Sequence, residues 1–136
     1  MKKSFDESRY NNILEICGLQ EDLQEFPKGD VTRITEQSLS GGQKARINLA
    51  RVLYEQEAHI YLLDDPLSSV DAKVRHHIFE RCIKSHLKQR LVVLATHQLQ
   101  FLPQADYIVV LSEVRFFDQF SFLKLIKSIQ LYNNLI

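Results

Sequence analysis

Apolar residues recur along this chain with two different periods, which predicts a mixture of helices and strands. Short apolar runs around residues 59–63, at 91–95 and at 107–111 have the length of strands buried in a sheet. Elsewhere apolar residues lie three or four positions apart, as on a helix with one buried face. We therefore expect helices at 6–17, 41–54 and 71–87 and a short helical piece through residue 23. Helices and strands that alternate in this way predict an α/β fold with a parallel sheet.

Capping residues predict where these helices begin and end. Ser4 or Asp6 can cap the first helix, and Gly18 can end it. Asp71 can cap the helix whose buried face is marked by Val74, Ile78, Cys82 and Leu87.

Two stretches carry candidate chemistry. Ser40 is a good N-cap, and Gly41 and Gly42 beside it leave backbone N–H groups open to an anion. Asp64 ends an apolar run, and the carboxyl ends of parallel strands are where open α/β sheets bind ligands. Oxygen ligands there favour Mg²⁺ together with nucleotide phosphates. The pattern thus predicts phosphate binding.

Four short motifs in the right order resemble those of ATP-binding cassette (ABC) ATPases. Residues 39–43 (LSGGQ) resemble the signature motif, and residues 60–64 (IYLLD) resemble the Walker B strand. Residues 68–71 (SSVD) resemble the D-loop, and His97 resembles the switch histidine.

The resemblance is closest to the first nucleotide-binding domain of multidrug-resistance-associated transporters, subfamily C, through residues 44–51 and 64–71. It implies part of a P-loop NTPase-type sheet with flanking helices and remnants of the ABC helical subdomain. Residues 5–113 would form the C-terminal part of the domain, divided into the helical subdomain at 5–38 and the motif-bearing core at 39–113. A divergent tail would follow at 114–136.

The resemblance also implies roles for the motif residues. Asp64 would orient Mg²⁺ through its water shell, Asp65 would act on the attacking water, and His97 would hydrogen-bond the γ-phosphate and that water. Asp65 stands where most active ABC domains carry glutamate, which marks the slower site of the pair. The contacts to the γ-phosphate of ATP on an opposing domain would come from Ser40, Gly41, Gly42 and Gln43. Asp71 would both cap its helix and cross the domain interface.

The sequence contains no G-x-x-x-x-G-K-[ST] phosphate loop among its four glycines. We therefore expect the C-terminal half of a cassette, from a partial gene model, a truncated isoform or a longer transporter, and we expect this chain alone to be inactive. In the intact protein the function would be ATP-driven export of organic anions or drugs. The alternatives are a soluble ABC ATPase of the chromosome or translation type and a non-catalytic fragment.

The composition of the chain limits which classes of partner it can be expected to bind. Seventeen basic and 17 acidic residues balance, which argues against a nucleic-acid partner. No apolar run is long enough to cross a bilayer, so we expect the chain itself to be soluble. The resemblance implies that the full transporter holds it at the cytoplasmic face of a membrane. Its partners there would be a second nucleotide-binding domain and transmembrane domains. Two cysteines indicate a reduced setting rather than a disulfide framework. No metal other than Mg²⁺ is expected, because the histidines and cysteines lack the paired spacing of a zinc module.

The tail is rich in Phe, Leu and Ile, and Phe116, Phe120 and Leu123 follow helical spacing. The resemblance stops after Glu113, and we expect a helical tail there. It could bind a membrane surface or a partner. A helix packed on the body or a product of an altered transcript is the simpler explanation.

Overall fold

The computed structural model describes residues 5–35, 38–55, 58–112 and 115–120. The chain forms two compact units, 1–96 and 97–136, and each is described by itself. No helix within the described ranges has both the length and the apolar character needed to cross a lipid bilayer.

The first unit begins with two helices. Helix α1 (Glu7–Ile16) is capped by Asp6, whose carboxylate accepts the Arg9 N–H at 3.0 Å. It ends at Gly18, which has φ +62° and so adopts the left-handed conformation that glycine tolerates best. Helix α2 (Gln20–Glu25) and the 3-10 helix η1 (Gly29–Val31) follow. The expected cap and stop of the first helix are thus confirmed.

Two longer helical segments complete this unit. Helix α3 (Gly41–Tyr54) begins with a capping box, in which Ser40 Oγ accepts the Gln43 N–H at 3.1 Å and Gln43 Oε1 accepts the Ser40 N–H at 2.9 Å. Helix α4 (Ala72–Ile78) is capped by Asp71 and continues as the π-helix η2 (Phe79–His86). The side chains of Ile78, Cys82 and Leu87 are buried, as the spacing predicts, and Val74 is half-buried.

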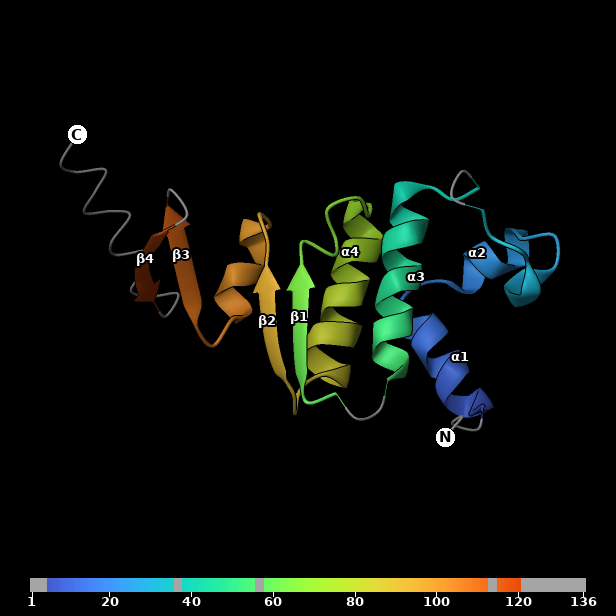
Figure 1. Cartoon of the computed structure of the whole chain (residues 1–136), viewed down its shortest axis with the longest axis horizontal. Helices are drawn as coiled ribbons and strands as arrows, with labels where there is room; N and C mark the ends of the chain where they lie inside the picture. The colour runs from blue at the N-terminus through green and yellow to red at the C-terminus, as the bar shows by residue number, and fades with distance from the viewer. Residues whose placement is uncertain (1–4, 36–37, 56–57, 113–114, 121–136) are drawn as a thin grey trace. The chain divides into compact units, whose positions relative to one another are not determined.

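Strands β1 (Ile60–Asp64) and β2 (Leu91–Ala95) lie side by side and run parallel (Figure 1). Their register pairs Ile60 with Leu91 and Asp64 with Ala95, which confirms the parallel α/β arrangement for two of the three expected strands. The third expected strand pairs antiparallel instead. One face of this sheet is covered, with Tyr61 and Leu63 buried.

The opposite face of the sheet differs from the expectation of buried strands. Its four large apolar side chains are each more than half exposed: Ile60, Leu62, Leu91 and Val93. Parallel sheets are normally covered on both faces, and the described helices of this unit cover only one.

The second unit contains the 3-10 helix η3 (Leu99–Gln104) and an antiparallel pair of strands, β3 (Ile108–Ser112) and β4 (Arg115–Phe120). The helical expectation for the tail is wrong for Arg115–Phe120, because these residues form a strand. Phe116 and Phe120 are four residues apart, a spacing that places two residues on the same face of a helix and also of a strand. Residues 121–136 lie outside the described residues.

Candidate functional site

The N-terminal turn of α3 lies against the loop that precedes α4. A Cβ added to Gly42 would meet the carbonyl oxygen of Ser69 at 2.9 Å, and one added to Gly41 would meet Ser69 Cβ at 3.4 Å. Glycine at position 42 is therefore what allows the two backbones to approach so closely. The structure thus brings together two stretches that were singled out from the sequence, residues 40–43 and 68–71.

This turn is suited to an anion. The first N–H groups of a helix have no intrahelical acceptor, and the helix dipole adds partial positive charge there. The Gln43 N–H is used by the Ser40 hydroxyl at 3.1 Å. The Gly41 and Gly42 N–H groups belong to the same turn, and Ser40 and Gly41 are exposed, so an oxyanion could approach.

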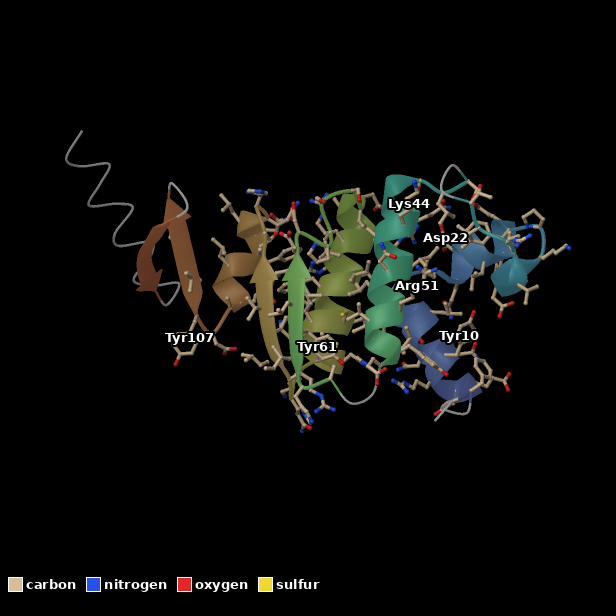
Figure 2. All side chains as sticks on the ribbon, in the orientation of Figure 1. Tyr10, Asp22, Lys44, Arg51, Tyr61 and Tyr107 are labelled. Atoms are coloured by element: carbon tan, nitrogen blue, oxygen red, sulfur yellow. The ribbon has the colours of Figure 1, made fainter. Side chains whose placement is uncertain are left out.

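Asp22 on α2, labelled in Figure 2, contacts two side chains of α3, Gln43 and Arg46. It is only 7% exposed, and its Oδ1 accepts Gln43 Nε2 at 3.0 Å and Arg46 Nη2 at 2.9 Å. Its Oδ2 lies 2.8 Å from Arg46 Nη1 in an ion pair. Sequence reasoning assigned no role to Asp22 or to Arg46, although Arg46 lies in the stretch 44–51 that carries the closer resemblance, because no apolar period marks either residue as buried.

The carboxyl end of β1 carries two carboxylates. Asp64 is the last residue of the strand and is exposed. Asp65 follows with φ +39°, a left-handed conformation that aspartate tolerates better than most residues. Its N–H donates to the Ala95 carbonyl at 2.9 Å, and its Oδ1 accepts the Thr96 hydroxyl at 3.4 Å. The hydrogen bonds of Asp65 therefore fix it at the end of β2, and its φ makes it a strained residue at the carboxyl edge of the sheet.

Asp65 is also linked to the loop at 68–71. Its carbonyl oxygen accepts the Ser68 N–H at 3.2 Å and the Ser68 hydroxyl at 3.0 Å. In the same loop, Asp71 Oδ1 accepts the N–H groups of Lys73 and Val74 at 3.1 and 3.0 Å, which confirms its expected capping role. The loop thus connects the acidic end of β1 with the first turn of α3.

The donor set at this edge suits a cation held mainly by water. No group of three or more His, Cys, Asp or Glu side chains that could hold a metal occurs in the described part of the chain. Mg²⁺ commonly takes one or two carboxylates and completes its shell with water and phosphate oxygens. Asp64, an exposed carboxylate at the end of β1, fits that pattern, whereas a zinc or calcium cage would need more protein ligands.

His97 begins the second unit and is exposed. It follows Thr96 in the chain, and its role toward a phosphate or a water molecule stays a prediction.

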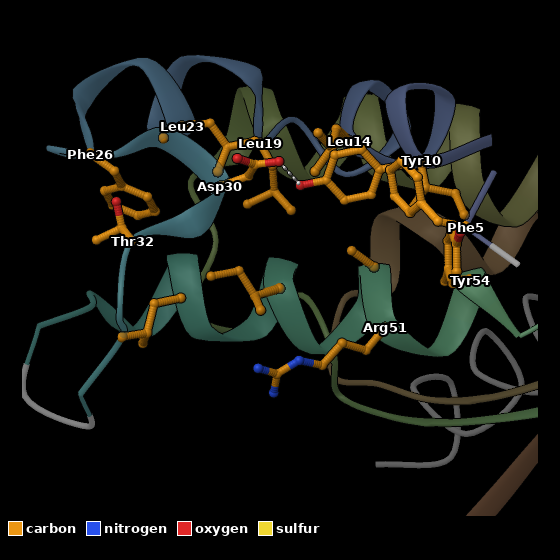
Figure 3. A pocket seen from close by; sticks show the side chains of 15 residues that line it. Phe5, Tyr10, Leu14, Leu19, Leu23, Phe26, Asp30, Thr32, Arg51 and Tyr54 are labelled. Atoms are coloured by element: carbon orange, nitrogen blue, oxygen red, sulfur yellow. Dashed lines mark hydrogen bonds between the residues drawn. The ribbon is translucent and has the colours of Figure 1, made fainter. Parts of the chain in front are cut away.

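A separate cavity of about 470 Å³ lies between α1, α2 and α3 (Figure 3). Aromatic residues contribute much of its lining: Phe5, Tyr10, Phe26 and Tyr54. The Tyr10 hydroxyl donates to Asp30 Oδ2 at 3.2 Å, and burial, together with this hydrogen bond, raises the pKa of Tyr10. None of the candidate site residues lines this cavity.

Comparisons with known proteins show which family the chain resembles. The ABC transporter family model matches residues 5–68. Human ATP-binding cassette sub-family C member 4 is 45% identical over 128 residues, which is 93% of this chain and 10% of that protein. A probable multidrug resistance-associated protein of Drosophila melanogaster, lethal(2)03659, is 51% identical over 79% of this chain and 8% of its own length.

A third relative shows how far along the chain the similarity extends. ABC transporter C family member 3 of Dictyostelium discoideum is 42% identical over 97% of this chain and 9% of its own length. That match extends into residues 114–136, where the resemblance was expected to stop. The chain spans about 10% of the length of the curated relatives it matches.

Proposed function

This chain belongs to the ABC transporter family, subfamily C, and on that premise we propose that it forms part of the ATP-binding cassette of a membrane exporter. The cassette couples ATP binding and hydrolysis to the transport of organic anions or drugs. The names of its relatives support a transporter, and one of them is described as a probable multidrug resistance-associated protein. The export direction and the substrate class are part of the proposal.

One observation carries the proposal: the glycine-bearing start of α3 packs against the loop at 68–71, with Gly42 pressed to the Ser69 carbonyl. In this arrangement the Gly41 and Gly42 N–H groups and the Ser40 hydroxyl lie at an exposed, positively polarised helix end. They would contact the γ-phosphate of ATP held by a second nucleotide-binding domain. Gln43 and Asp71 would complete that contact surface.

Asp64 and Asp65, at the carboxyl end of β1, serve a different nucleotide, the one held by this chain's own domain. Asp64 would hold Mg²⁺ through water, and the ion would neutralise phosphate charge when bound. Asp65 would orient the attacking water, and His97 would hydrogen-bond the phosphate and that water. Aspartate at position 65 is one methylene shorter than glutamate, so the proposal makes this the slower of two sites.

The implied assembly contains partners in the same transporter. A second nucleotide-binding domain would face the residues 40–43, and transmembrane domains would use the energy of ATP. The cassette would then work at the cytoplasmic face of the membrane. This sequence has no phosphate-loop motif, so hydrolysis by the chain alone is not part of the proposal.

Single-turnover hydrolysis in a transporter that contains this chain tests these roles, with labelled nucleotide distinguishing the two sites. Ser40→Arg places bulk where a phosphate must approach and should slow the site opposite this chain at least tenfold. Asp65→Glu should speed the site built from Asp64 and Asp65, since a misplacement of about 1 Å can cost on the order of 100-fold.

Ser85→Arg makes the same exchange at an exposed position of η2 and should leave both rates unchanged. The assignment is wrong if Asp65→Glu changes neither rate while Ser40→Arg slows the Asp65 site. It is also wrong if Ser85→Arg slows hydrolysis as much as Ser40→Arg does.

A further inference from the structure

Gln43 is held at both ends of its side-chain amide. Its Oε1 accepts the Ser40 N–H at 2.9 Å, and its Nε2 donates to Asp22 Oδ1 at 3.0 Å. An ordinary capping box needs only the first of these bonds. The second bond reaches 21 residues back along the chain and ties the first turn of α3 to α2.

Arg46, which belongs to the same helix, also contacts this turn. Its Nε donates to the Gly42 carbonyl at 3.4 Å, and its Nη1 donates to the Gly18 carbonyl at the end of α1. Its guanidinium also contacts both oxygens of Asp22, at 2.9 and 2.8 Å. One planar side chain therefore joins α1, α2 and the first turn of α3, which the fork of an arginine can do and a lysine cannot.

Burial shows that this cluster is more than a surface ion pair. The Arg46 and Asp22 side chains are 14% and 9% exposed, whereas those of Arg81 and Glu15, paired at 2.7 Å, are 51% and 46% exposed. A buried pair bears a desolvation cost that an exposed pair avoids, and its firmest use is to fix one geometry. The geometry fixed here is that of residues 40–43.

We propose that Asp22 and Arg46 are positioning residues for the Ser40–Gln43 turn. They hold the Gln43 side chain and the Gly42 carbonyl so that the N–H groups of the turn keep one orientation toward a phosphate, and they couple that orientation to α2. The claim about the phosphate rests on the proposed function. The claim about the turn rests on the contacts of this chain alone.

Amide hydrogen exchange on the full chain tests the second claim. The Gln43 and Lys44 N–H groups bond to Ser40 at 3.1 and 3.0 Å and report on the turn. The Arg75 and Leu87 N–H groups, bonded at 2.8 and 2.9 Å, report on α4 and η2. In Asp22→Asn and in Arg46→Lys we expect about tenfold faster exchange at Gln43 and Lys44 only, because loss of a charge-assisted contact opens the turn locally.

A merely structural role would speed all four amides together, since they would then exchange through unfolding of the unit. That result overturns the proposal, as does loss of cooperative unfolding in both variants. The matched control is Glu15→Gln, which removes one carboxylate from the exposed pair and should change none of the four. Arg46→Lys keeps the charge, so it separates the fork geometry from simple neutralisation.

ATP-dependent pairing tests the first claim, with an ATP-loaded nucleotide-binding domain that carries its own phosphate loop as the probe. Asp22→Asn should weaken pairing about tenfold, and Glu15→Gln should not. If the unaltered chain does not pair, the proposed function fails, and hydrogen exchange still decides the role of Asp22 and Arg46. If pairing survives unchanged in Asp22→Asn, the claim about the phosphate is wrong.

Discussion

Helix α3 begins with two glycines that differ in how closely another part of the chain passes them. The nearest atom to an added Cβ would be a backbone oxygen at 2.9 Å for Gly42 and a side-chain carbon at 3.4 Å for Gly41. A backbone oxygen cannot turn away as a side chain can. The two positions are therefore matched in residue type and helix turn but not in the space around them.

Gly42→Ala should destabilise the chain by about 1–3 kcal/mol, the usual cost of forcing an extra carbon into a packed site. In an exposed helix the same change gains about 1 kcal/mol, so the expected sign depends on the contact with Ser69. Urea unfolding measures the difference. Gly41→Ala is the control and should be neutral or slightly stabilising. Equal effects at the two positions would contradict the close approach.

Cys17 and Cys82 are both free and buried, and burial raises the pKa of each thiol to about 12 from 9.0. A thiol with a raised folded-state pKa ionises more easily in the unfolded chain. Its contribution to stability is present below pH 9 and is lost as the pH rises toward 12.

The free energy of unfolding should therefore fall with pH between about 9 and 11, measured by urea unfolding in reduced samples. In Cys17→Ala/Cys82→Ala the starting stability will be lower because a buried atom is lost from each site, but the fall with pH should be shallower. A parallel fall in both chains would show that the thiols do not titrate with unfolding.

The two faces of strand β1 differ in how far their side chains are buried. Leu63 is 8% exposed and Leu62 is 76% exposed, although they are neighbours in one apolar run. Leu63→Ala should cost about 2–5 kcal/mol, because it leaves a cavity in the core. Leu62→Ala should change the unfolding free energy by about 0.5 kcal/mol or less. Urea unfolding of the two variants makes the comparison, and a large cost at Leu62 would mean that this face is covered in solution.

Most of these elements could be predicted from the sequence because their signals are local. Ser40 and Asp71 precede apolar-periodic stretches and cap α3 and α4 as expected. The runs at 60–64 and 91–95 pair in parallel. The tail was different, since the spacing of Phe116 and Phe120 suits either type of element, and residues 115–120 joined β3 as a strand.

The candidate site was predicted only in part, because some of its contacts are long-range. The glycine pair and the acidic edge carry recognisable residue types. Asp22 sits in a short polar helix, and its contacts with Gln43 and Arg46 span 21 and 24 residues of sequence. The positive φ of Asp65, which precedes a proline, also had no clear sequence signal.

The sequence holds the residues proposed to face a phosphate, but it contains no phosphate-loop motif that would cradle one. The full 136-residue chain should therefore not bind Mg-ATP measurably at micromolar concentration. Calorimetric titration checks this, and a nucleotide-free domain that carries its own phosphate loop provides the positive control. Stoichiometric micromolar binding by the chain alone would show that it contains a nucleotide cradle of another kind.

The pairing of Ile60 with Leu91 also sets an order for biosynthesis. At about 5–20 residues per second, β1 is made about 2 to 6 s before its partner strand is complete. Helices form within microseconds, so α3 and α4 have time to form before β2 is available to pair with β1. Throughout that interval the edge of β1 that later bonds β2 is open to other chains. Chaperone capture of nascent chains should therefore peak before Leu91 emerges from the ribosome and decline once Ala95 has joined the ladder.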